Sequence, residues 1–181
     1  MARSPVPLLV GVGLLGALVA LTSSGQSSAA PRPRPQGPYA GPWPDGLDAG
    51  SIAHLRTLHP DAAAAFVEVW RRAAAEGLPF KITSSKRDCA TQNKLYAQGR
   101  TAPGPIVTHA RGCQSWHVAG RAIDVSIAAG NTTANLARVG QLAKDAGGQW
   151  GGDFAGFYDG GHLEYHPGLT LRDVCPDPDH C

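Results

Sequence analysis

Two short segments of the chain gather residue types that bind metal ions and hydrolyse amides. The first, Ser-Trp-His-Val-Ala-Gly-Arg-Ala-Ile-Asp, contains His117 and Asp124, and the second, Asp-Gly-Gly-His-Leu-Glu-Tyr, contains His162. Two imidazoles and one carboxylate form a ligand set that zinc uses in catalytic sites, where a fourth position stays open for water. The sequence therefore marks His117, Asp124 and His162 as the candidate ligands of one zinc ion.

Asp159 precedes His162 across a Gly-Gly pair and is the candidate general base. A metal-dependent hydrolase needs a group that takes a proton from water. Gly120 is expected to turn the backbone so that His117 and Asp124 face one point, and the glycines before His162 are expected to give the same freedom. The spacing from His117 to Asp124 is common by chance, whereas its combination with Asp-x-x-His downstream is rarer.

The segment from His162 to His166, His-Leu-Glu-Tyr-His, allows a second interpretation. Metalloprotease helices carry two such histidines, but their glutamate directly follows the first one, and Pro167 and the nearby glycines oppose a helix. On a strand, the two histidines and Glu164 share one face. Glu164 is then expected to orient a ligand histidine, although it stays open as an alternative base. We expect no role in the site for Asp153 and the other histidines: His54, His59, His109 and His180.

The elements that position these residues mix helix and strand without a regular β-α-β alternation, which predicts an α+β fold. Apolar residues at helical spacing, bounded by Pro and Gly, and shorter alternating runs define the elements. The predicted helices cover residues 51–58, 60–76, 88–98 and 131–146, and the predicted strands cover 79–83, 122–127 and the region of Leu163 and Tyr165. The residues expected in the core are Phe66, Trp70, Leu136 and Leu142.

The N-terminal part has the pattern of an export signal. Residues 8–21 are an unbroken run of Leu, Val, Gly and Ala, preceded by Arg3 and followed by small residues, which is typical of a signal peptide. We expect a signal peptide over 1–29. An uncleaved anchor is the alternative, although the run is shorter than the roughly 20 residues of a spanning helix. The expected remainder is a Pro-rich linker (30–46), one domain (47–170) and a C-terminal tail (171–181).

Export makes disulfides the expected state of the four cysteines. We expect Cys89 to pair with Cys113 and Cys175 with Cys181, although three connectivities are possible. A Cys/His zinc site that includes His180 is the alternative. The net charge of +2 is too small to indicate nucleic acid or a membrane surface. The expected protein is therefore secreted or in the cell envelope, monomeric, and bound neither to nucleic acid nor, after signal cleavage, to membrane.

Taken together, the motifs resemble a known family. SxHxxGxAxD, then WGG, then DxxH resembles the zinc D-Ala-D-Ala carboxypeptidases and L-alanyl-D-glutamate endopeptidases of the D,D-peptidase/hedgehog fold. The stretch Thr-Ser-Ser-Lys-Arg resembles the strand-end motif of this family, with Lys86 where an aromatic residue is usual. The likeness runs from about Leu55 to His166 and implies a small single domain with an antiparallel sheet and flanking helices. Further residues in the order of the family are Gln92, Leu95, Tyr96, Gly99, Arg100, Thr101, Pro103, Gly104, Val107 and Thr108.

The resemblance also implies roles. The three candidate ligands match the zinc ligands of the family, and Asp159 matches its general base. Arg87 matches the arginine that stabilises the carbonyl oxygen as it becomes an oxyanion. Ser115 matches a hydroxyl near the first ligand that is either structural or in contact with substrate. We expect Ser115 and Gln92 to contribute to substrate binding.

The implied activity is zinc-dependent hydrolysis of an amide bond in a peptidoglycan stem peptide. An Asp at position 159, where D,D-carboxypeptidases more often have Glu, resembles the L-alanyl-D-glutamate endopeptidase branch. A D-Ala-D-Ala carboxypeptidase is the alternative activity, and a non-catalytic, zinc-containing wall-binding module is the alternative class. Cys89 and Cys113 flank Arg87 and His117 in sequence, so their disulfide would brace both sides of a cleft.

Overall fold

The computed structural model of this chain describes residues 38–175. The predicted signal peptide (1–29) and part of the predicted linker lie outside these residues. Cys181 does so too, and its pairing with Cys175 stays a prediction. None of the helices between residues 38 and 175 has the length and apolar character that crossing a bilayer requires.

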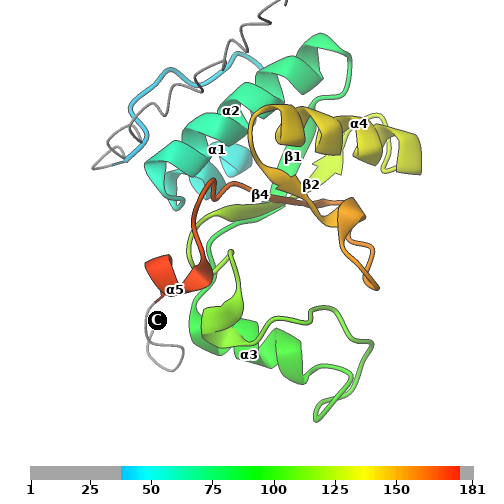
Figure 1. Cartoon of the computed structure of the whole chain (residues 1–181). Coiled ribbons are helices and arrows are strands. Elements are labelled where there is room, and N and C mark those ends of the chain that lie inside the picture. Colours follow the sequence, from blue (N-terminus) through cyan, green and yellow to red (C-terminus); the bar gives the residue numbers. More distant parts are fainter. Residues whose placement is uncertain (1–37, 176–181) are drawn as a thin grey trace, which may run out of the picture. The chain divides into compact units, whose positions relative to one another are not determined.

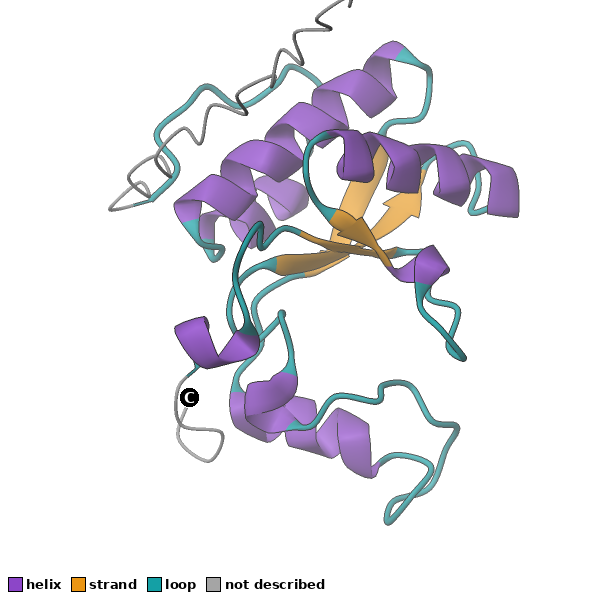
Figure 2. Ribbon diagram, in the orientation of Figure 1, coloured by secondary structure: helices purple, strands orange, loops and turns teal. Residues whose placement is uncertain are grey.

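A four-stranded sheet forms the centre of the fold (Figure 2). Its strands follow the order β1-β2-β4-β3, and every neighbouring pair is antiparallel, as expected for this α+β fold. The two-residue strand β3 was not predicted, because so short a segment shows no alternation. The strands are β1 (Phe80–Ser84), β2 (Ala122–Ile127), β3 (Gln149–Trp150) and β4 (His162–Glu164).

Three helices, α1, α2 and α4, cover one face of the sheet, and α3 and α5 lie on its other side (Figure 1). Side chains cap the N-termini of several of these helices. The Asp48 side chain accepts a hydrogen bond from the backbone N–H of the third residue of α1, and the Thr132 side chain does the same for α4. Pro60 begins α2, and the left-handed Gly77 follows its end. The helices are α1 (Ala49–Arg56), α2 (Pro60–Ala75), α3 (Cys89–Ala97), α4 (Thr133–Asp145) and α5 (Leu171–Val174).

The hydrophobic core lies between the sheet and the three helices that cover it, α1, α2 and α4. All four residues predicted for it are buried: Phe66, Trp70, Leu136 and Leu142. Ile123 and Val125 of β2 and Leu163 of β4 meet them from the sheet. Tyr39 and Trp43, from the end of the predicted linker, also pack against the core.

Residues 86–114, here called the α3 arm, fold differently. Three of them are buried, namely Gln92, Gly112 and Cys113, so the arm has almost no apolar core of its own. The predicted disulfide between Cys89 and Cys113 is present and joins the start of α3 to the end of the arm. Polar contacts connect other parts of the arm. Asn93 accepts a hydrogen bond from the N–H of Gly112, and Arg100 donates to two carbonyls of the arm.

Candidate metal centre and active site

The pairing of two strands brings two of the three candidate ligands together. Along β2, Ile123 and Val125 face the core, so the period of two in a strand turns Asp124 to the opposite face. Along β4, Leu163 faces the core, and His162 turns to the opposite face in the same way. Asp124 and His162 are direct partners across the two strands. Their side chains therefore lie side by side, away from the helices.

The third ligand comes from the turn before β2. Gly120 has a φ of +66°, and its N–H donates to the carbonyl of His117. This confirms the expected turn, because a residue with a side chain rarely adopts that conformation. The segment after β1 fixes His117 from the other side, since the N–H of Arg87 donates to the His117 carbonyl. Ser115 accepts a hydrogen bond from the N–H of His117 through its Oγ.

The glycines before His162 have a different purpose from the one expected. Neither Gly160 nor Gly161 has a positive φ. Both lack space for a side chain: a Cβ on Gly160 would lie 2.4 Å from the Tyr158 hydroxyl, and one on Gly161 would lie 3.1 Å from the Val125 carbonyl oxygen. The glycines therefore allow close packing at these two positions and do not supply a left-handed backbone conformation.

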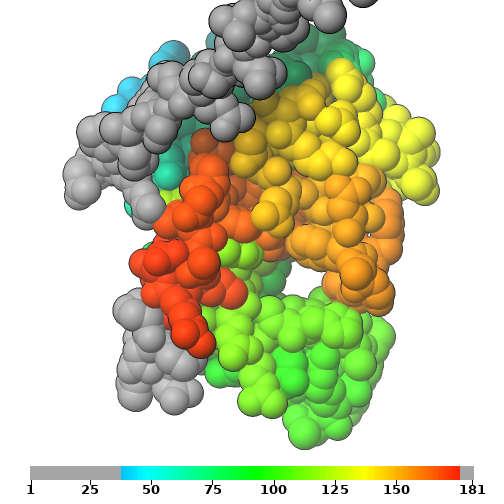
Figure 3. Space-filling model, viewed as in Figure 1, coloured from blue at the N-terminus to red at the C-terminus, as the bar shows by residue number. Residues whose placement is uncertain are grey.

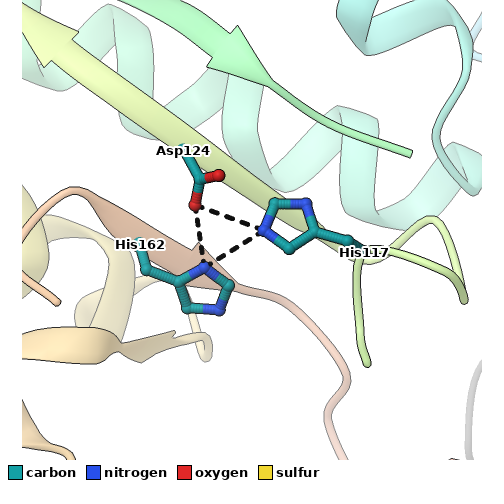
Figure 4. Close-up of side chains that lie close together, drawn as sticks. All are labelled: His117, Asp124 and His162. Carbon is teal, nitrogen blue, oxygen red and sulfur yellow. Dashed lines mark hydrogen bonds and ion pairs between the residues drawn. The ribbon is translucent and has the colours of Figure 1, made fainter. Parts of the chain in front are cut away.

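Three donor atoms converge at the centre of the site (Figure 4). The distance from Asp124 Oδ1 to His162 Nδ1 is 3.0 Å, and the distance to His117 Nε2 is 3.2 Å. The two histidine nitrogens are 3.3 Å apart. Ligands on a tetrahedral zinc ion, each about 2.0–2.1 Å from the metal, stand roughly 3.3 Å from one another. The triangle thus has the size and the chemical composition of three zinc ligands, and it leaves one corner of the tetrahedron open.

Hydrogen bonds on the far side of each ring fix its tautomer. The Nδ1–H of His117 donates to the carbonyl of Ser85 at 2.6 Å, because a carbonyl can only accept. The Nε2–H of His162 donates to Glu164 at 2.8 Å for the same reason. The remaining ring nitrogens turn their lone pairs to the centre. Such outer partners orient metal-binding histidines, which agrees with the orienting role expected for Glu164.

Glu164 is held in turn by His166. The second oxygen of the carboxylate lies 3.0 Å from His166 Nε2, and the His166 ring stacks on Trp116 at 3.7 Å between centroids. Both carboxylate oxygens of Glu164 are thus engaged with histidines. The geometry favours Glu164 as an orienting group over the alternative in which it is the general base.

The acidic groups set the electrostatics of the centre. Burial acts to raise the pKa of Asp124, but hydrogen bonds from His117 and His162 outweigh it and hold that pKa well below its usual range. Burial acts to lower the pKa of His162, but Asp124 and Glu164 raise it to about 9. Burial likewise opposes the effect of His162 and His166 on Glu164, whose pKa falls to about 2. The two acids thus favour positive charge at the centre.

Asp159 lies beside the centre and lines the same cleft as the three ligands. Burial is the main cause that raises its pKa above the ordinary aspartate value, a shift that suits a group that must accept a proton. The Trp-Gly-Gly motif holds this residue in place. Trp150 donates from Nε1 to the carbonyl of Gly160 at 2.9 Å, and the N–H of Asp159 donates to the carbonyl of Gly151.

Arg87 reaches the centre from the end of β1. Its Nη2 donates to Asp124 Oδ2 at 2.5 Å, and Nη2 and Nε both donate to Ser84. Its Nη1 donates to Gln92 at 3.3 Å. A guanidinium has five N–H groups, so one on Nη1 has no partner among residues 38–175. Arg87 therefore orients a candidate ligand and keeps one donor free at the cleft.

The two residues expected to bind substrate have different positions. Ser115 lines the cleft, and its Oγ accepts the N–H of His117 within the turn, a role that does not use its O–H as a donor. Gln92 is fully buried, and its amide group joins Arg87 to Thr108 and to the carbonyl of Ala110. This placement favours Gln92 as a residue that positions Arg87 and the cleft wall rather than as a contact of the substrate.

A cleft of about 400 Å³ opens over the centre. The candidate ligands, Asp159 and Arg87 form its base. One wall is residues 107–110 of the α3 arm, and the other is residues 154–157, which follow the Trp-Gly-Gly motif. No sequence pattern predicts either segment as a wall of the cleft, because neither has periodicity or a concentration of chemically distinctive residues, although Val107 and Thr108 are among the residues that follow the order of the family.

Comparison with known proteins agrees with this site. A family model described as D-alanyl-D-alanine carboxypeptidase matches residues 108–165. The peptidoglycan L-alanyl-D-glutamate endopeptidase CwlK of Bacillus subtilis (strain 168) is 36% identical over 124 residues, which cover 61% of this chain and 74% of that protein. The chain therefore belongs to the M15 family of zinc metallopeptidases.

Solved structures show the same fold. The L-Ala D-Glu endopeptidase ChiX of Serratia marcescens has a TM-score of 0.50 and 25% identity, over 69% of this chain and 90% of that one. The LD-carboxypeptidase LdcB has a TM-score of 0.50 and 18% identity, over 82% of this chain and 75% of that one. The small α+β fold with an antiparallel sheet is thus shared with these two solved structures.

Proposed function

We propose that this protein is a zinc-dependent peptidase that hydrolyses the bond between L-alanine and D-glutamate in peptidoglycan stem peptides. The observation that supports this most is the triangle of donor atoms from His117, Asp124 and His162, with Asp159 beside it at the base of a cleft. The bond itself is assigned from similarity, since CwlK and ChiX both have this specificity in their names.

The three donors would hold one zinc ion, which polarises a carbonyl and acidifies water. Asp159 takes the proton of the attacking water on its carboxylate and passes it to the leaving amine. The free N–H of Arg87 donates to the carbonyl oxygen as negative charge develops there, a contribution of about 10²–10³ in rate. The Ser85 carbonyl and Glu164 keep the ligand histidines oriented throughout.

D-Ala-D-Ala carboxypeptidase activity is the second candidate, because the matching family model has that description. The two activities use the same centre and differ in where the peptide lies in the cleft. The endopeptidase needs room for peptide on both sides of the cleaved bond, whereas the carboxypeptidase needs a pocket for one terminal residue.

Mass analysis of the products from a defined muropeptide with a full stem pentapeptide separates these functions. The zinc-loaded protein is expected to release a peptide with a new N-terminal D-glutamate. Release of free D-alanine instead would make it a carboxypeptidase. Zinc binding without either product would support a wall-binding module and refute the proposal.

Asp159→Asn tests the proposed base. The amide keeps the shape of the carboxylate but cannot accept the proton, so kcat is expected to fall by about 10²–10⁴ with the zinc content unchanged. Asp153→Asn, at an exposed acid on the same stretch of chain, is the matched control and is expected to keep the wild-type rate. Wild-type kcat in the Asp159 variant would assign the base elsewhere, with Glu164 as the next candidate.

The substrate also supports a location. Stem peptides of peptidoglycan lie outside the cytoplasmic membrane, which agrees with the export signal expected over residues 1–29. We infer that the mature protein acts in the cell envelope or outside the cell, as a monomer with one zinc ion.

A further inference from the structure

The two walls of the cleft meet at their outer ends. The ring of His109 contacts the ring of Phe157, with 4.7 Å between their centroids and an interplanar angle of 64°, an edge-to-face arrangement. His109 belongs to the α3 arm and Phe157 to the segment after the Trp-Gly-Gly motif, and both residues line the cleft. The contact therefore joins the two walls of the cleft.

An opening remains between the two walls beneath this bridge. Figure 3 shows it between the segment drawn in orange and the arm drawn in green, which come together at the outer edge. The candidate zinc ligands lie at the base of the same cleft. A peptide that enters through this opening passes beneath the ring contact, whereas one that enters from the outer edge separates the rings.

Packing in the hydrophobic core does not account for the two rings. His109 is exposed and Phe157 is half-buried, and neither belongs to the hydrophobic core. The arm that carries His109 is fixed by the disulfide and by buried Gln92. Phe157 lies two residues before Asp159, so its segment is fixed at the catalytic centre. The rings thus extend from two anchored segments into the entrance of the cleft.

Building on the proposed function, we propose that His109 and Phe157 form an aromatic clasp that selects uncross-linked stem peptides. A linear peptide with a free end passes beneath the clasp, which then confines it over the centre. A cross-linked peptide is branched and continues as a second chain, so it enters only when the ring contact breaks. The clasp therefore disfavours cross-linked substrates by the free energy of that contact, on the order of two- to tenfold in rate for an aromatic pair.

The test compares two soluble substrates with the same cleaved bond, an uncross-linked muropeptide and its cross-linked dimer. In His109→Ala and in Phe157→Ala, the ratio of kcat/KM for the dimer to kcat/KM for the monomer is expected to rise about two- to tenfold. The double variant is expected to rise no further, because either substitution already removes the contact. His109→Phe, which keeps an aromatic ring, is expected to retain the low ratio.

Ile106→Ala, at an exposed apolar residue of the same arm, is the matched control and is expected to leave the ratio at the wild-type value. A ratio that stays at this value in both alanine variants, including a parallel loss on both substrates, overturns the clasp. If the wild-type protein cleaves neither substrate, the proposed function is refuted. The clasp is then tested separately, by calorimetric titration of the metal-free protein with the monomeric and the dimeric muropeptide. The affinity ratio of dimer to monomer must then rise in the alanine variants and stay unchanged in His109→Phe.

Discussion

Removal of the Cys89–Cys113 disulfide is expected to open the α3 arm while the rest of the domain stays folded. The change is the double variant Cys89→Ala/Cys113→Ala, since alanine at the buried position 113 adds no unpaired hydroxyl. Cys113 is the one apolar side chain of the arm that is buried, so the local stability of the arm depends largely on polar contacts and on this bond. The core between the helices and the sheet contains neither cysteine.

The magnitude follows from the loop that the disulfide closes. The two cysteines are 24 positions apart, and a loop of that length loses about 3.5 kcal/mol of stabilisation at 25 °C when it is no longer closed. Local stabilities range from near zero to the global value. A loss of this size is therefore comparable with the whole local stability of an arm that lacks a core.

Hydrogen exchange measures this directly. Protection of amides in α3 is expected to fall by roughly 10²–10³-fold, whereas amides of β2 and α2 serve as an internal reference and keep most of theirs. Activity is expected to fall in proportion to the closed fraction of the arm, because Gln92 and residues 107–110 form the cleft wall only when the arm is closed. Wild-type protection of α3 in the variant, or full activity beside an open arm, would refute the reasoning.

Three further outcomes are expected. Glu164→Gln removes the charge that orients His162 and should weaken zinc binding about 10–100-fold in a chelator competition. Glu68→Gln, at an exposed position, is the control. Equal zinc affinities of the Glu164 variant and the wild-type protein would exclude the orienting role. Gly151→Ala places a Cβ 2.4 Å from the Asp159 carbonyl oxygen and should therefore displace Asp159. Activity should fall, while the temperature of thermal unfolding should stay close to that of the wild-type protein. A fully active variant would contradict this packing. Asp61 pairs with buried Arg121 at 2.9 Å, and Asp61→Asn should cost about 3 kcal/mol in urea unfolding at pH 7. Burial raises the pKa of Asp61, but hydrogen bonds from His59 and Arg121 outweigh it and lower that pKa. Its contribution is thus present above about pH 4 and is lost as pH falls further, so the two midpoints should approach each other at pH 3.

The sequence predicts the ligands and most of the elements because each rests on a local pattern. Helical spacing around Phe66 and Leu136 is strong enough to define α2 and α4. The strand β2 was predicted over its full length, since the alternation from Ala122 to Ile127 reflects one buried and one open face. The convergence of Asp124 and His162 then follows from the register, which is a property of the whole sheet and can only be inferred from the residue types involved.

Other features of the site depend on contacts between distant segments. Nothing near Gln92 in sequence indicates that it is buried beneath Arg87, because its partners at Thr108 and Ala110 belong to a loop without regular structure. His109 was expected to have no role for a similar reason. Its ring partner, Phe157, is far away in sequence, and only the folded chain brings the two walls together.

The charges around the donor triangle favour a cation at the centre of this site. With both histidines neutral, Asp124, Asp159 and Glu164 together with Arg87 leave a net charge of −2 in a largely buried space, and such charges are costly unless paired. A divalent ion balances them without changing the tautomers. Without the ion, protons must do so, which is the physical meaning of the rise in the pKa of His162 to about 9. Zinc and protons therefore compete for the same lone pairs, and zinc binding must release protons. The acids outside the triangle, Asp159 and Glu164, raise the affinity of the centre for zinc and for protons alike. The tautomers fixed by the outer hydrogen bonds favour zinc, because a zinc ion can bind all three donor atoms at once.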